Sequence, residues 1–117
     1  MTKDRIALFR EQGYAVIPDF FSNREIKAMR IELDRLRKDG LLRNVATDGD
    51  GVTPSIEKRN LQICPIAPKS RFFRSMPFQP RIIETISQLI GDPFVFYLDQ
   101  IFLKPGKQGI GTNWHQD

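Results

Sequence analysis

The residues with the clearest chemical potential stand at the end of the chain, where one residue separates His115 from Asp117. Side chains at positions i and i+2 of a β-strand point to the same face, so on a strand this imidazole and this carboxylate would converge. Imidazole nitrogens and carboxylate oxygens both bind divalent transition metals. The spacing therefore predicts that His115 and Asp117 are two ligands of one metal ion.

Two histidines and one carboxylate on one face of a metal ion, with the other positions open, form the ligand set of non-haem iron(II) oxygenases. His115 is the only histidine of the 117 residues, so a second histidine ligand would have to come from elsewhere. A His-x-Asp pair also occurs by chance in many proteins, where it is a surface or hydrogen-bonded pair. The choice between these interpretations depends on the rest of the chain.

Helix signals dominate the first part of the sequence. Residues 4–12 predict a short helix, and residues 14–18 predict a short strand closed by proline. Ser22 and Glu25 form a capping box before a helix whose apolar residues recur at three- and four-residue steps. Residues 79–90 show the same periodicity and predict a second amphipathic helix that ends at a glycine.

Strand signals accumulate later in the chain. Residues 44–55 form a loop by composition, and their Asp-Gly repeats lack the ligand ladder of a calcium-binding loop. The segments expected to form strands are 56–63, 94–98, 101–103 and 112–117. Helices that precede the strands indicate an α+β fold.

Composition favours an ordinary globular protein, because 40% of the residues are hydrophobic and 27% are charged. No apolar run reaches the roughly 18 residues that a membrane span needs, and the charged N-terminus is unlike a signal peptide. The single cysteine, Cys64, fits a reducing compartment, so we expect a cytoplasmic location. The net charge is +4, but acidic residues are interspersed with the basic ones, which argues against a nucleic-acid partner.

The order of motifs along the chain resembles the phytanoyl-CoA dioxygenase family of iron(II)- and 2-oxoglutarate-dependent oxygenases. The specific part of the resemblance is the Lys-Pro-Gly turn at 104–106 followed by Trp-His-Gln-Asp at 114–117. Weaker support comes from Gly-Tyr at 13–14, Phe-Phe-Ser at 20–22 and Leu-Ile-Gly-Asp-Pro at 89–93. The resemblance covers nearly the whole chain. It implies N-terminal helices packed on the beginning of a double-stranded β-helix (jelly-roll) sheet that is incomplete in this chain.

The same resemblance implies roles for individual residues. His115 and Asp117 would be ligands of iron(II), the implied metal cofactor. Candidates for binding 2-oxoglutarate, the implied co-substrate, are Gln100, Lys104 and Thr112.

The family's second histidine ligand, and the basic residue that binds the far carboxylate of 2-oxoglutarate, lie downstream of the His-x-Asp motif. We therefore expect residues 1–117 to be a single domain, the N-terminal part of an oxygenase domain that would continue beyond residue 117. We also expect the isolated chain to be inactive.

Three functions remain open at this point. The first is the N-terminal part of a dioxygenase that hydroxylates a small organic molecule. The second is a non-catalytic jelly-roll-like binding or interaction domain, in which His115 and Asp117 are structural. A basic nucleic-acid-associated protein is a third and weaker alternative. We expect a small-molecule substrate and neither nucleic acid nor a membrane as partner, while the sequence determines neither the substrate nor the oligomeric state.

Overall fold

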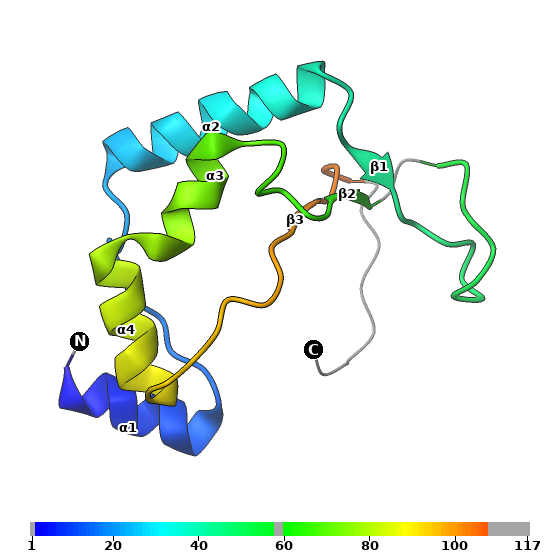
Figure 1. Ribbon diagram of the computed structural model, residues 1–117. Coiled ribbons are helices and arrows are strands. Elements are labelled where there is room, and N and C mark those ends of the chain that lie inside the picture. The colour runs from blue at the N-terminus through cyan, green and yellow to red at the C-terminus, as the bar shows by residue number, and fades with distance from the viewer. Residues whose placement is uncertain (1, 58–59, 108–117) are drawn as a thin grey trace.

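The computed structural model describes residues 2–57 and 60–107. Its elements, in chain order, are α1 (Lys3–Gln12), α2 (Asn23–Lys38), β1 (Arg43–Asn44), β2 (Leu61–Ile63), α3 (Arg71–Ser75), the 3₁₀ helix η1 (Met76–Phe78), α4 (Pro80–Ile90) and β3 (Ile101–Leu103). Figure 1 shows the helices gathered on one side and the three short strands on the other. This mixture of helices and a small antiparallel sheet agrees with the predicted α+β class. Among the described residues, no helix combines the length and apolar character needed to cross a membrane.

Helix α2 begins and ends at the signals that the sequence contains. At its start, the Ser22 N–H donates to the Glu25 carboxylate at 2.8 Å and the Glu25 N–H donates to Ser22 Oγ at 3.3 Å, which completes the capping box. At its end, Gly40 has a φ of 70°, and the Leu41 N–H donates to the Leu36 carbonyl at 3.1 Å. This left-handed glycine and six-to-one hydrogen bond form a Schellman motif, so the predicted helix is confirmed at both ends.

The three strands form one antiparallel sheet with β2 in the centre. The register places Gln62 opposite Arg43 of β1 on one side and opposite Phe102 of β3 on the other. Ile63 pairs with Ile101. Because side chains alternate along a strand, Gln62 and Ile63 lie on opposite faces of the sheet.

The hydrophobic core lies between the C-terminal part of α2 and one face of the sheet. Leu36 and Ile63 are completely buried, and Ile66 is 3% exposed. The partly buried residues packed around them are Leu41, Leu42, Phe73 and Ile101. The core therefore connects α2, β2, β3 and α3.

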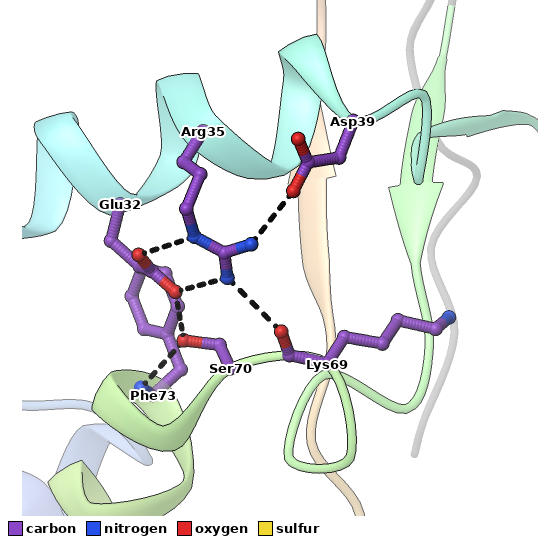
Figure 2. A network of polar contacts seen from close by, with 6 residues as sticks. All are labelled: Glu32, Arg35, Asp39, Lys69, Ser70 and Phe73. Carbon is purple, nitrogen blue, oxygen red and sulfur yellow. Dashed lines mark hydrogen bonds and ion pairs between the residues drawn. The ribbon is translucent and has the colours of Figure 1, made fainter.

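A polar network, the α2–α3 joint, fixes α2 to the chain segment that enters α3 (Figure 2). Arg35 donates two hydrogen bonds to the Glu32 carboxylate, at 2.7 and 2.9 Å, and one to Asp39 at 2.7 Å. Arg35 also donates to the Lys69 carbonyl at 3.1 Å, and the buried Ser70 hydroxyl donates to Glu32. Hydrogen bonds from Arg35 and Ser70 lower the pKa of Glu32 from 4.5 to about 2.

A second network, the α2–α4 joint, fixes the start of α2 to α4. Arg81 forms an ion pair with Glu25 and donates to the Phe20 carbonyl at 3.1 Å. Its guanidinium carbon lies 5.3 Å from the centre of the Phe20 ring and 4.9 Å from that of Phe21, which is cation–π geometry. Arg81, together with the Ser22 hydrogen bonds, lowers the pKa of Glu25 to about 2.

The loop between β1 and β2 is as irregular as its composition predicts. One isolated bridge joins Thr47 to Pro54. The Asp50 carboxylate accepts hydrogen bonds from the backbone N–H groups of Val52 at 2.9 Å and Thr53 at 2.8 Å. The Asp-Gly repeat thus closes a turn, as its loop composition predicted.

The structure confirms fewer of the predicted strands than of the predicted helices. Residues 14–18 and 94–98 form no strand, and among the described residues of the segment 56–63 the strand is limited to Leu61–Ile63. The two wrong segments are rich in β-forming residues, but in the described structure no strand pairs with either, and a ladder needs a partner. The described strands form a three-stranded sheet, so the jelly roll, its incompleteness and the single domain that continues beyond residue 117 stay predictions.

Candidate functional site

Two of the five predicted site residues are described by the structure. Thr112, His115 and Asp117 lie outside the described residues, so the metal site stays a prediction. Gln100 and Lys104 immediately precede and follow β3. Across the described part of the chain, no group of three or more His, Cys, Asp or Glu side chains could hold a metal ion.

Strand β3 separates its side chains into an inward and an outward set. Ile101 and Leu103 are half-buried, and Ile101 packs against the core. Gln100, Phe102 and Lys104 alternate with them and are exposed. The structure therefore brings the two predicted co-substrate residues to one side of the sheet, opposite the core.

The sheet register adds two residues that sequence reasoning missed. Gln62 lies opposite Phe102, and Arg43 lies opposite Gln62, so both share the outward side of the sheet. Gln62 Nε2 donates a hydrogen bond to Gln100 Oε1 at 2.9 Å across the two strands. The period-two pattern around Ile63 could have indicated that Gln62 points outward, but nothing local predicts that it meets Gln100. We call Arg43, Gln62, Gln100, Phe102 and Lys104 the polar sheet face.

An inward anchor fixes the start of β3. The half-buried Asp99 carboxylate accepts a hydrogen bond from the Ala67 backbone N–H, which ties the entry of β3 to the loop after β2. Successive side chains on an extended chain point to opposite sides. With Asp99 held toward the interior, Gln100 is directed outward to Gln62.

The polar sheet face carries one sign of charge. Arg43 and Lys104 are cationic, Gln62 and Gln100 bear amides, and Phe102 supplies an apolar surface; none of the five is acidic. Guanidinium, ammonium and amide groups donate hydrogen bonds to carboxylates. The donor set therefore fits a carboxylate-bearing ligand, and 2-oxoglutarate is a dicarboxylate.

An apolar groove lies elsewhere in the described residues, between η1, α4 and residues 92–96. Its volume is about 680 Å³, and nearly all its lining residues are isoleucine, phenylalanine, valine or proline. Its one carboxylate, Asp92, accepts a hydrogen bond from the Ser87 hydroxyl. The groove has no cationic side chain, so it does not suit an anionic ligand.

Comparison with known families defines the class of protein. The model of the phytanoyl-CoA dioxygenase (PhyH) family matches residues 9–117, which is nearly the whole chain. The chain belongs to the phytanoyl-CoA dioxygenase family, and the predicted membership is confirmed. The match includes the polar sheet face and extends over His115 and Asp117.

The curated relatives are ectoine dioxygenases. The protein of Halomonas elongata is 31% identical over 112 residues, which cover 93% of this chain and 32% of that protein. The protein of Stutzerimonas stutzeri is 27% identical and covers 93% of this chain and 35% of its own length. The protein of Bordetella bronchiseptica is 20% identical over the whole chain and 37% of its own length. The chain thus spans about a third of these relatives, and no solved structure matches it significantly.

Proposed function

We propose that this chain is the N-terminal part of a non-haem iron(II)- and 2-oxoglutarate-dependent dioxygenase that hydroxylates a small organic molecule. The observation that carries the proposal is the family match over residues 9–117, which includes the His-x-Asp pair. The one-sided donor set of the polar sheet face adds support, because it suits a dicarboxylate. The non-catalytic alternative has no observation in its favour.

In this proposal His115 and Asp117 are two of the three iron ligands, and a histidine outside these 117 residues is the third. Imidazole and carboxylate suit iron(II), and a facial arrangement leaves positions open for a co-substrate. When bound, iron(II) would supply the oxidising chemistry together with 2-oxoglutarate and dioxygen. The protein's own contribution is to hold the ligands and reactants in place.

The polar sheet face positions the co-substrate. The Lys104 ammonium and the Gln100 amide donate to carboxylate oxygens, and Thr112 donates a further hydrogen bond. The exposed ring of Phe102 lies between Gln100 and Lys104 and excludes water from the bound molecule. Removing water strengthens each of these charge-assisted hydrogen bonds, since the local dielectric constant falls.

Ectoine is the first substrate to test, because the curated relatives are named ectoine dioxygenases. The identities of 20% to 31% make a related small molecule the next choice. A cytoplasmic location remains part of the proposal and rests on the single cysteine.

The test uses the full-length gene product that carries this chain. Succinate formed from 2-oxoglutarate is measured with and without iron(II) and ectoine. We expect iron-dependent turnover that His115→Ala abolishes, because the metal loses a ligand. Gln116→Ala is the matched control, since on the strand that the sequence predicts its side chain would point to the face opposite His115 and Asp117. Turnover without iron, or unchanged turnover in His115→Ala, would contradict the proposal.

The 117-residue chain alone is the second arm of the test. It lacks a second histidine, and the relatives are about three times as long. We expect it to release no succinate. Substrate-dependent succinate formation by the purified short chain would show that the proposed division of the site is wrong.

A further inference from the structure

We propose that Gln62 is a positioning residue that orients the Gln100 amide so that its NH₂ group faces a ligand carboxylate. The inference rests on the proposed function, in which Gln100 contacts an anionic reactant. It adds a residue from a different strand, and it assigns to that residue a role that acts through Gln100.

The first step is the support of Gln62 itself. Strand β2 is paired on both sides, so the backbone of Gln62 is held between β1 and β3. Its side chain is half-buried, whereas Arg43 and Phe102, its direct neighbours across the strands, are exposed. Gln62 is thus the best supported of the five residues of the polar sheet face.

The second step is the diagonal contact. Gln62 is paired with Phe102, and Gln100 is two residues before Phe102 on the same side of the extended chain. Diagonal neighbours of antiparallel strands are within reach of long side chains. The 2.9 Å hydrogen bond from Gln62 Nε2 to Gln100 Oε1 is this diagonal contact. The inward anchor at Asp99 keeps Gln100 on the side where the contact forms.

The third step is the polarity of the amide. A glutamine amide has an oxygen that accepts hydrogen bonds and a nitrogen that donates two. Because Gln62 donates to Gln100 Oε1, the oxygen of Gln100 is engaged by β2 and its Nε2 is turned away from Gln62. A carboxylate only accepts hydrogen bonds, so it binds the Nε2 end and is repelled by the oxygen end. Gln62 therefore selects the amide orientation that binds anions.

The carboxylate has two possible sources within the proposed function, 2-oxoglutarate and the substrate, since ectoine also carries a carboxylate. The shared chemistry is a carboxylate oxygen that accepts from Gln100 Nε2. Two titrations, one with each molecule, distinguish the sources.

The experiment is a double-mutant cycle on the full-length protein, with manganese(II) in place of iron so that no turnover occurs. Isothermal titration calorimetry gives the Kd of 2-oxoglutarate and, with 2-oxoglutarate present, of ectoine. The variants are Gln62→Met, Gln100→Met and the double variant. Gln62→Lys is the conservative rescue, because its Nζ still donates to Gln100 Oε1.

In one of the two titrations we expect Gln100→Met to raise Kd about tenfold, the loss of one hydrogen bond to a charged group. Gln62→Met should raise the same Kd by a few-fold, and the double variant should bind no more weakly than Gln100→Met alone. Gln62→Lys should bind about as tightly as the wild type. Thermal unfolding midpoints of all variants should agree, which excludes a merely structural role.

Other results of the titrations would contradict the role of Gln62, the ligand contact of Gln100 or the proposed function. If the factors by which the two substitutions raise Kd multiply in the double variant, Gln62 does not act through Gln100. An unchanged Kd in Gln62→Met would also overturn the role of Gln62. Neither result would contradict the proposed dioxygenase function. An unchanged Kd of both molecules in Gln100→Met would remove the ligand contact of Gln100 and the inference with it. If the wild type shows no iron-dependent turnover of 2-oxoglutarate, the proposed function itself fails.

Discussion

The helix joints and the polar sheet face use similar side chains in opposite ways. In the α2–α3 joint, Arg35 lies between Glu32 and Asp39, and in the α2–α4 joint Arg81 pairs with Glu25. On the polar sheet face, two cations and two amides occur without an acidic residue. Balanced charges hold elements together, whereas charges of one sign on one side favour a ligand of the other sign. The difference suggests that substitutions in the joints change stability and that those on the sheet face change binding.

The largest expected loss of stability comes from the core to which the α2–α3 joint is attached. Leu36→Ala in the full-length protein should lower the free energy of unfolding by about 2–5 kcal/mol, because it leaves a cavity beside Ile63 and Ile66. Urea unfolding measures the change. Ile31→Ala is the matched control on the same helix, since Ile31 is 62% exposed, and it should cost far less. Equal losses in the two variants would show that α2 does not pack as described.

The next largest effect is expected at Ser70, which serves two elements at once. Its hydroxyl donates to Glu32 and accepts from the Phe73 N–H at 3.1 Å, so it both caps α3 and completes the α2–α3 joint. Ser70→Ala should cost about 1–3 kcal/mol of unfolding free energy. The exposed Ser75 at the end of α3 provides the control, and Ser75→Ala should be close to neutral. If Ser70→Ala leaves the free energy of unfolding unchanged, the α2–α3 joint does not contribute to stability.

The pH dependence of unfolding tests the joints as charged structures. Folding lowers the pKa of Glu32 from 4.5 to about 2, so its ionised form stabilises the fold above pH 4.5. That contribution is lost as the pH falls from 4.5 toward 2, because protonation then costs less in the unfolded chain. The urea midpoint should therefore fall less over this range in Glu32→Gln than in the wild type. Glu84 lies outside both joints, so the urea midpoint of Glu84→Gln should change with pH as that of the wild type does. If the wild type and both variants show the same pH dependence, the ionised Glu32 does not stabilise the α2–α3 joint.

The smallest change in stability is expected on the polar sheet face. Lys104→Met should change the unfolding free energy less than the core and joint substitutions do, because the side chain is exposed. It should nevertheless raise the KM for 2-oxoglutarate several-fold in the full-length enzyme, because a charge-assisted contact to the carboxylate is removed. Lys107→Met, three residues further along, is the control. If Lys104→Met lowers stability without changing the KM for 2-oxoglutarate, Lys104 has a structural role, and the proposed difference between the polar sheet face and the joints is wrong.

The sequence predicted the helices well because their signals are local. The capping box of α2, the apolar periodicity of α4 and the glycine after each of these two helices involve residues three or four positions apart. The strands were predicted less well, because β propensity does not say whether a partner strand is present. Residues 94–98 illustrate this, since five β-forming side chains lie outside any ladder of the described structure.

The candidate site divides in the same way. The spacing of two residues predicted His115 and Asp117 as metal ligands. The order of motifs around them identified the family without any structure. Gln100 and Lys104 also followed from this order. Gln62 and Arg43 did not, because they are separated from β3 by about 40 and 60 residues of sequence.

The sequence by itself determined the family, the helix boundaries and the residues proposed as metal ligands, since each depends on types and spacings along the chain. Only the tertiary structure decided that Gln62 hydrogen-bonds Gln100 and that five residues in or next to the three described strands share one side of the sheet. It also decided that Arg35 and Arg81 act as joints between helices. The physical reason is that strand register and helix packing join residues far apart in sequence, and no local pattern contains that information.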